Sequence, residues 1–201
     1  NDACIAIAEH IAGSTDAFVE MMNARAKELG LKDTKFANPH GLSEKDHYMS
    51  AYDIAMLSKE AMQHELFRKM IATQELKLKR RNSENHFYSR NKLLFTYKGA
   101  DGVKTGFTDD AGYCLAASAT RNNLRLIAVV MNAGGSGAHF RECTKLLNYG
   151  FANYTAKEII KKGDTVKVAK VCKGKDETVA LVAKDSLYVM VKKGEDEKFR
   201  Q

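Results

Sequence analysis

The chain has 201 residues, enough for one domain with a sizeable core or for one domain plus part of another, and its content of 44% hydrophobic and 28% charged residues is ordinary for a globular protein. No apolar run in it reaches the roughly 18 residues that a membrane-spanning helix requires, so the sequence excludes such a helix. The net charge of +7 comes from scattered Lys and Arg residues without interleaved aromatic residues, which argues against nucleic acid as a partner.

The N-terminal part of the chain is predicted to be helical. Apolar residues at helical spacing predict a helix over Asn1–Ala12, which ends at Gly13. Ser14 and Thr15 can cap a second helix that runs to about Leu29. Two consecutive helices are therefore expected before the first long loop.

A loop and two further helices are expected next. The segment Lys32–Met49 contains turn-forming sequence around Pro39, the only proline, and is predicted to be a loop. The segment Ser50–Asp53 has the pattern of a capping box, which predicts a third helix to about His64. A short helix is expected near Leu66–Ile71.

The middle of the chain is predicted to contain strands. Alternation of polar and apolar residues predicts a half-exposed strand over Glu75–Lys79, followed by a polar loop over Arg80–Asn91. Because Asn tolerates positive φ, the pair Asn122 and Asn123 predicts a hairpin turn between the last two strands of the next group. That group comprises Val103–Thr108, Gly112–Ala119 and Leu124–Asn132.

A helix and a second β-rich region complete the chain. The helix is expected over Ala138–Tyr149, with Gly150 ending it. The composition then shifts after Tyr154, so we predict one domain over residues 1–154 and the start of a β-rich domain over residues 155–201. The strands expected in the second region are Thr165–Val171, Thr178–Val182 and Ser186–Val191.

The four cysteines do not form a recognisable metal or redox motif. None is in a C-x-x-C pair or near a histidine at ligand spacing, so no metal site and no cofactor is expected. Their apolar surroundings favour buried small hydrophobic residues over disulfides. They are Cys4, Cys114, Cys143 and Cys172.

The triplet Lys104-Thr105-Gly106 on a predicted strand is the strongest chemical signal. At the edge of a serine acyl-enzyme site, Lys104 would supply positive charge for a substrate carboxylate and for proton transfer. The hydroxyl of Thr105 would hydrogen-bond the same carboxylate, and Gly106 would let a substrate backbone lie close to the strand. Taken alone, the triplet is much more typical of a surface strand that turns at glycine.

The surroundings of the triplet carry a resemblance. Asp101–Thr108, followed by Ala111–Tyr113 and Leu115–Ala119, closely resembles the KTG strand region of D-alanyl-D-alanine carboxypeptidases, the low-molecular-mass penicillin-binding proteins of serine peptidase type. The resemblance extends over nearly the whole chain. Further similar segments are Asn1–Cys4, Ser50–Ala55, Arg90–Leu94, Arg125–Met131 and Ile159–Gly163.

This resemblance implies a fold and an activity. The implied fold is α+β, a mainly antiparallel sheet flanked by helices as in the penicillin-recognising, β-lactamase-like fold, followed by a partial β domain. The implied activity is a serine-type carboxypeptidase that acts on the D-Ala-D-Ala stem peptide of peptidoglycan through an acyl-enzyme, shapes the cell wall and is inhibited by β-lactam antibiotics. The implied location is extracytoplasmic, either secreted or on the outer face of the cytoplasmic membrane.

The family pattern is incomplete in this chain. Its order is S-x-x-K, S-x-N and K-T-G, and Asn1 matches the asparagine of S-x-N, so we expect both serines and the lysine base to lie upstream of Asn1. The S-x-x-K of Ser89–Lys92 and the S-x-N of Ser83–Asn85 occur in the wrong order within a polar stretch, and we interpret both as coincidental. The chain by itself is therefore expected to be inactive.

The resemblance assigns candidate site residues. Asn1 and Lys104 are the candidate catalytic residues, and the triplet binds substrate. Phe107 follows the triplet where some relatives carry His, and His139 is nearest to the position where many relatives carry a carboxylate-binding Arg, with Arg141 two residues on. We expect Phe107, His139 and Arg141 to contact substrate, although the last two also fit solvated residues in a helix's first turn.

Two other functions fit parts of this pattern. A non-catalytic peptidoglycan-binding or scaffolding relative would keep the cleft wall without the nucleophile. A β-lactamase-type relative fits less well, because single-domain β-lactamases lack the β-rich tail. Residues 1–201 alone are also expected to expose core and to associate with a partner or another copy, and a further C-terminal segment could attach the whole protein to a membrane.

Overall fold

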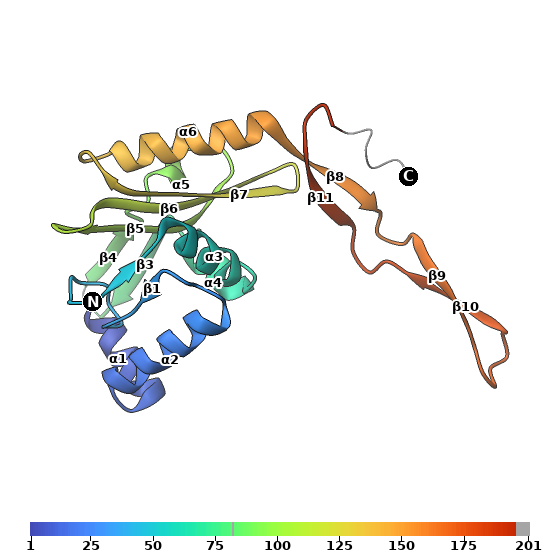
Figure 1. Cartoon of the computed structure of the whole chain (residues 1–201), viewed down its shortest axis with the longest axis horizontal. Helices are drawn as coiled ribbons and strands as arrows, with labels where there is room; N and C mark the ends of the chain where they lie inside the picture. Colours follow the sequence, from blue (N-terminus) through green and yellow to red (C-terminus); the bar gives the residue numbers. More distant parts are fainter. Residues whose placement is uncertain (82, 196–201) are drawn as a thin grey trace. The chain divides into compact units, whose positions relative to one another are not determined.

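The computed structural model describes residues 1–81 and 83–195 (Figure 1). The chain divides into two compact units, one formed by residues 1–119 and 126–148, the other by residues 120–125 and the described part of 149–201. The division at residue 154 stays a prediction, and residues 196–201 of the predicted β domain lie outside the described residues.

The first four helices follow the predicted order, and α5 is an addition to it. The turn between α1 and α2 is built as expected, because Gly13 ends α1 with a φ of 82° and the Ser14 hydroxyl accepts the Ala17 N–H at 3.1 Å. The helices are α1 (Asp2–Ala12), α2 (Thr15–Glu28), α3 (Ala51–Ala61), α4 (Glu65–Ile71) and α5 (Leu93–Thr96).

The predicted capping box at the start of α3 forms only in part. The Ser50 hydroxyl accepts the Asp53 N–H at 3.1 Å, as expected. The Asp53 carboxylate, however, is buried and accepts the Asp33 N–H at 2.8 Å and the Thr34 hydroxyl at 2.7 Å. It thereby ties α3 to the short strand pair β1 (Thr34–Lys35) and β2 (Tyr48–Met49), which interrupts the segment predicted to be a loop.

A three-stranded sheet forms the centre of the first unit. Its order is β5-β6-β7, so β5 is an edge strand of this sheet. The two-residue turn before β7 has positive φ at Asn122 (48°) and Asn123 (63°), which confirms the predicted hairpin. The strands are β5 (Ala100–Thr108), β6 (Gly112–Arg121) and β7 (Leu124–Ala133).

Helices cover both faces of this sheet (Figure 1). Helix α6 (Ala138–Asn153) lies along one face, where Cys143 and Leu147 are fully buried and the Cys143 thiol contacts the carbonyl oxygen of Leu115. Helices α3 and α4 lie on the other face. The predicted end of α6 at Gly150 is wrong, because this glycine is buried inside the helix, which continues for three more residues.

An apolar hollow of about 470 Å³ remains between α3 and the sheet. Its lining is mainly apolar, with Ser58, Lys104 and Thr105 as polar members, and comes from α3, α4 and all three strands. Leu57 of α3, Phe67 of α4 and Leu115 of β6 are among the residues that line it. The core of the first unit is thus well packed beneath α6 and open on the opposite face of the sheet.

Residues 83–88, within the segment predicted to be a loop, instead form the second strand of a hairpin. Strand β3 (Glu75–Arg80) pairs in antiparallel register with β4 (Ser83–Tyr88), and the side chains of β4 are all exposed. An imidazole nitrogen of His86 lies 2.7 Å from a Glu75 carboxylate oxygen on the partner strand. Because neither face of β4 is buried, its sequence lacks the alternation that identifies strands, and the prediction failed for that reason.

The second unit contains two antiparallel strand pairs. Strand β9 (Thr165–Lys170) pairs with β10 (Thr178–Val182), in agreement with the predicted strands. Strand β11 (Leu187–Lys192) pairs with β8 (Tyr154–Ile160), which the sequence analysis missed. No helix among the described residues is long and apolar enough to cross a membrane.

The cysteines are all unpaired thiols, but their burial differs from the prediction. Only Cys143 is buried, and burial raises the pKa of its thiol to about 12. Cys114 is half-buried, whereas Cys4 and Cys172 are exposed. The interpretation as small buried hydrophobic residues is therefore right for Cys143 alone.

We predict that Gly112→Ala destabilises the first unit by about 2 kcal/mol, because a β-carbon there requires a left-handed backbone and lies too close to β7. Gly112 has a φ of 64°, and its β-carbon would lie 2.5 Å from Asn132 Oδ1 and 3.2 Å from Asn132 Cα. Chemical denaturation measures the change. Gly134→Ala is the control, because no atom lies within 4 Å of its β-carbon; equal effects of the two substitutions would contradict the prediction.

Candidate functional site

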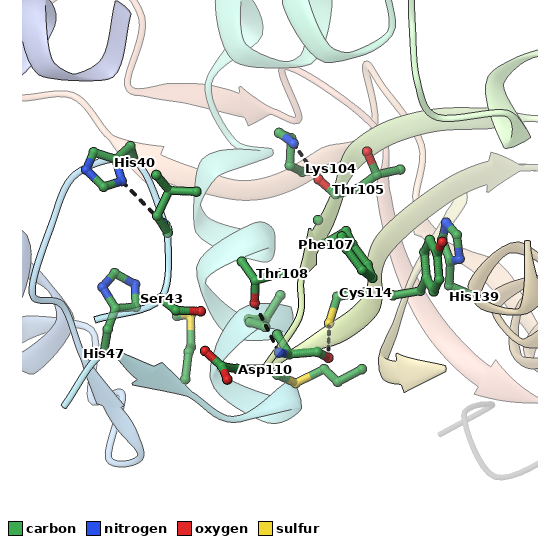
Figure 2. Close-up of a pocket in the computed structure, with 18 of the residues that line it drawn as sticks. His40, Ser43, His47, Lys104, Thr105, Phe107, Thr108, Asp110, Cys114 and His139 are labelled. Carbon is green, nitrogen blue, oxygen red and sulfur yellow. Dashed lines mark hydrogen bonds between the residues drawn. The ribbon is translucent and has the colours of Figure 1, made fainter. Parts of the chain in front are cut away.

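A cleft of about 1020 Å³ lies at the open edge of β5. Figure 2 shows side chains reaching it from three walls: His40 and His47 from the loop between β1 and β2, Lys104 to Thr108 from β5, and His139 from the start of α6. Asn1 and Arg90 also line the cleft. The cleft is therefore formed by residues from the beginning, the middle and the end of the sequence that makes up the first unit.

The structure brings together all but one of the predicted site residues. Asn1, the triplet, Phe107 and His139 line the same cleft, whereas Arg141 does not. Two residues along a helix turn the side chain by about 200°, so burial of His139 against the sheet directs Arg141 to solvent. Arg141 is exposed, as the solvated alternative expects, and its contact with substrate stays a prediction.

Lys104 is a cation in an unfavourable electrostatic position. Although the residue is exposed overall, partial desolvation of its ammonium group lowers its pKa, and the neighbouring Arg90 guanidinium lowers it further. The Cys4 thiol acts weakly in the opposite direction. The ammonium group donates a hydrogen bond to the Thr105 carbonyl oxygen and forms no ion pair with any residue that the structure describes. An anionic ligand that binds this ammonium group would therefore gain favourable electrostatic energy.

The rest of the triplet leaves the strand edge accessible. The Thr105 hydroxyl has no hydrogen-bond partner among the residues described, so it can donate to a ligand. No atom lies within 4 Å of a β-carbon built on Gly106, which shows open space beside the backbone. Because β5 is the edge strand of its sheet, an extended peptide can lie along it.

Asn91 fixes the position of the segment that carries Arg90. Its buried side-chain amide donates to the Gly102 carbonyl oxygen at 2.9 Å and accepts the Leu93 N–H at 3.2 Å. One side chain therefore joins the start of α5 to β5, two residues before Lys104. The bond to Gly102 thereby holds the segment that carries Arg90 against β5, where Arg90 lines the cleft.

The S-x-x-K of Ser89–Lys92 has no geometry suited to a nucleophile. Ser89 lies before α5 rather than within its first turn, and its hydroxyl accepts the Asn91 N–H at 3.2 Å. The S-x-N of Ser83–Asn85 lies on the exposed strand β4. Neither segment contributes a serine or a lysine to the cleft described here.

A cluster of aromatic rings lines part of the cleft. The rings of Phe107 and Tyr113 lie 4.5 Å apart, and Tyr113 stacks on His139 at 5.4 Å with an interplanar angle of 9°. Phe140 contacts the imidazole at 4.0 Å. Burial, and then the charge of Lys92, lowers the pKa of His139.

The loop opposite β5 is a wall that the sequence analysis did not assign to the site. Asn38 shapes its turn, because its side chain accepts the Gly41 N–H at 2.7 Å and donates to the Leu42 carbonyl oxygen at 2.9 Å. His47 is half-buried and accepts the Ala37 N–H, and desolvation lowers its pKa. Turn chemistry at Pro39 was visible in the sequence, but the proximity of this loop to β5 was not.

Comparison with known families gives matches along the chain. The profile of D-alanyl-D-alanine carboxypeptidase matches residues 1–135, and that of the penicillin-binding protein 5 C-terminal domain matches residues 154–201. D-alanyl-D-alanine carboxypeptidase DacF of Bacillus subtilis (strain 168) is 44% identical over 198 residues, which are 98% of this chain and 51% of that protein. The chain spans about half the length of the curated relatives that it matches.

Solved structures give the same relationship. Penicillin-binding protein 5 from Haemophilus influenzae is 36% identical with a TM-score of 0.76, and the match covers 98% of this chain and 57% of that one. A peptidoglycan synthesis regulatory factor (PBP3) from Streptococcus pneumoniae is 30% identical with a TM-score of 0.78, over 97% and 60% of the two chains. The predicted resemblance and fold class are confirmed.

We predict that Asn91→Ala lowers the free energy of unfolding by about 1–3 kcal/mol, because it leaves the buried Gly102 carbonyl oxygen and the Leu93 N–H without partners. Asn91→Asp keeps an acceptor but loses the donor, so it should also destabilise. Chemical denaturation and hydrogen exchange of the β5 amides measure both effects. Asn148→Ala, at an exposed asparagine, is the control; unchanged exchange in β5 of Asn91→Ala would refute the anchoring role.

Proposed function

This chain belongs to the D-alanyl-D-alanine carboxypeptidase family, and on that premise we propose that it forms the substrate-binding wall of a serine-type carboxypeptidase that trims peptidoglycan stem peptides. The observation that carries the proposal is the position of Lys104-Thr105-Gly106 on an open edge strand that lines the cleft with Asn1 and Arg90. Residues 155–201 begin a β-rich C-terminal domain in this proposal.

The substrate lies along β5 with its terminal carboxylate at the triplet. The Lys104 ammonium group and the Thr105 hydroxyl bind the carboxylate, since both are accessible and lack an anionic partner among the described residues. Open space at Gly106 accommodates the peptide backbone, and Asn1 contributes its side-chain amide to the opposite side of the substrate. Phe107 contacts the terminal residue through its exposed ring.

The proposed reaction is acyl transfer through a serine ester. A serine hydroxyl, deprotonated by a lysine, forms a bond to the carbonyl carbon of the penultimate D-Ala. The bond from that carbon to the terminal D-Ala nitrogen breaks, and the nitrogen takes up a proton. Water then cleaves the ester and returns a proton to the serine. The serine and its base come from a segment that precedes Asn1 in the complete protein.

The partners and the location follow from this chemistry. The substrate is the D-Ala-D-Ala end of a stem peptide, and β-lactam antibiotics acylate the same serine as analogues of that dipeptide. Peptidoglycan lies outside the cytoplasm, so the complete protein acts in that space, secreted or held at the outer face of the membrane by a segment beyond this chain. Its activity there would contribute to cell shape.

We expect the protein made from the complete coding sequence to gain the mass of one penicillin on incubation with benzylpenicillin, whereas residues 1–201 alone gain none. Lys104→Met should slow acylation by about 10- to 100-fold, the loss of one charge-assisted hydrogen bond to the carboxylate. Lys59→Met, at an exposed lysine of α3 outside the cleft, is the matched control. Intact-mass spectrometry measures both the adduct and its rate.

Two results would overturn this proposal. Absence of an adduct on the complete protein would favour a non-catalytic peptidoglycan-binding relative. An adduct on residues 1–201 alone would place a nucleophile within this chain and contradict the proposed origin of the serine.

Residues 1–201 alone should also associate with further copies through the apolar hollow, because it exposes aliphatic surface between α3 and the sheet. Leu57→Lys, within the hollow, should shift sedimentation toward monomers. Leu66→Lys, at a leucine of α4 that is 69% exposed and outside the hollow, should not. A monomeric wild-type chain that unfolds cooperatively would contradict the prediction.

A further inference from the structure

Strand β5 contains one residue more than β6 at the point where the two strands begin to pair. Ala100 lies opposite Ala119 in the ladder. Two residues further along β5, Gly102 lies opposite Ser118, so β5 has Asp101 as an extra residue where β6 has none. Such a β-bulge bends the strand and changes which residues share a face with the partner strand. The bulge lies three residues before the triplet begins.

This extra residue determines which face of the sheet carries Lys104. Residues that lie opposite each other in an antiparallel pair place their side chains on the same face. With the bulge, Lys104 lies opposite Ala116 and reaches the cleft. If the register of Ala100 with Ala119 continued without a bulge, Lys104 would lie opposite Leu115, whose side chain is fully buried. Because a shift of one residue moves every side chain to the other face, an ammonium group that faces the cleft requires the bulge.

A hydrogen bond from the core holds the bulge. The Ser118 hydroxyl donates to Asp101 Oδ1 at 2.6 Å, and Ser118 is fully buried. Gly102 makes room for this bond, because a β-carbon on Gly102 would lie 3.0 Å from the Ser118 hydroxyl oxygen and 2.5 Å from Ile71 Cδ1. A hydroxyl that donates to a carboxylate forms a charge-assisted bond, which is stronger than a bond between neutral groups. The bond therefore fixes the residue that sets the register of the triplet.

We propose that Asp101 and Ser118 are positioning residues, which hold the bulge and thereby aim the Lys104 ammonium group at the ligand carboxylate. The proposal rests on the proposed function, which gives Lys104 that carboxylate. Bulges interrupt a ladder and occur preferentially beside active sites, where they redirect a side chain. Neither Asp101 nor Ser118 is among the residues that line the cleft, so both act through the strand and not on the ligand.

The test measures acylation of the complete protein by benzylpenicillin and by its methyl ester, which lacks the charged carboxylate. Asp101→Ala and Ser118→Ala each remove the bond. Each should slow acylation by benzylpenicillin by about tenfold, because a small displacement of the ammonium group weakens its bond to the carboxylate. Acylation by the ester should be nearly unchanged. Asp101→Asn keeps an oxygen that accepts the Ser118 hydroxyl, so this variant should retain the wild-type preference for benzylpenicillin.

Two controls separate the position of Lys104 from the stability of the fold. Leu147→Ala removes a fully buried side chain of α6 and should lower the free energy of unfolding without changing the ratio of the two acylation rates. In a double variant, Asp101→Ala with Lys104→Met, the loss should be no larger than in Lys104→Met alone, since the bulge then has no ammonium group to aim. Thermal unfolding checks that each variant is folded at the assay temperature, and Ser118→Ala replaces Asp101→Ala in the cycle if the latter does not fold.

Three outcomes contradict the proposal. Equal losses with benzylpenicillin and with the ester would show that the bond supports the fold but does not aim Lys104. Additive losses in the double variant would show that the bulge and Lys104 act independently. A loss in Asp101→Asn equal to that in Asp101→Ala would assign the effect to the charge of Asp101 instead of the hydrogen bond.

A measurement of strand register separates this proposal from the proposed function. In the complete protein, nuclear Overhauser effects should connect Lys104 with Ala116 across β5 and β6. In Asp101→Ala and Ser118→Ala they should weaken, and hydrogen exchange of the amides around the bulge should accelerate. If benzylpenicillin acylates none of the proteins, the proposed function fails, and the register measurement still decides whether Asp101 and Ser118 hold the strand. Unchanged cross-strand effects and unchanged exchange in both variants refute the positioning role.

Discussion

The candidate site depends on one constraint: β5 must be held firmly along one edge and remain open along the other. Pairing with β6 fixes the inner edge over the whole length of the strand. Asn91 adds a hydrogen bond to the Gly102 carbonyl oxygen at the beginning of β5. The outer edge at Lys104 to Gly106 faces the cleft. A strand held in this way can present a charge, a hydroxyl and a bare backbone to an extended ligand without rearranging.

Lys104 and Arg90 line the cleft together, and neither forms an ion pair with a residue that the structure describes, although the carboxylates of Glu44 and Asp110 also line it. Arg90 lowers the pKa of Lys104, and Lys92 lowers that of His139, while no carboxylate contributes to either shift. Arg25, by contrast, forms an ion pair with Glu60 at 2.9 Å. Like charges gathered around a hollow reduce stability and are retained where an anion binds. The cations in the cleft repel one another, and binding of the proposed anionic ligand would relieve that repulsion.

Much of the fold could be predicted from local signals, because the residues concerned act on their own neighbours. Gly13 ends α1, Ser14 caps α2 and the Asn122-Asn123 turn joins two strands through interactions within a few residues. Prediction failed where contacts between residues far apart in the sequence determine the local structure. Gly150 should end a helix by its own propensity, but it is buried inside α6, where the helix packs closely. The carboxylate of Asp53 does not complete the predicted capping box but accepts the N–H of Asp33, twenty residues earlier in the sequence.

The same distinction between local and distant interactions applies to the residues of the site. Lys104 to Phe107 are consecutive, so a sequence motif could identify them, whereas the loop around His40 reaches the cleft only through tertiary structure. Two glycines illustrate the difference in physical terms. Gly112 is required by the fold, because its backbone is left-handed and a β-carbon would meet Asn132. Gly106 has no left-handed backbone, and no atom lies close to the position of a β-carbon, so the fold itself does not require a glycine there. A ligand that lies against the strand would require one, because a side chain would occupy its space.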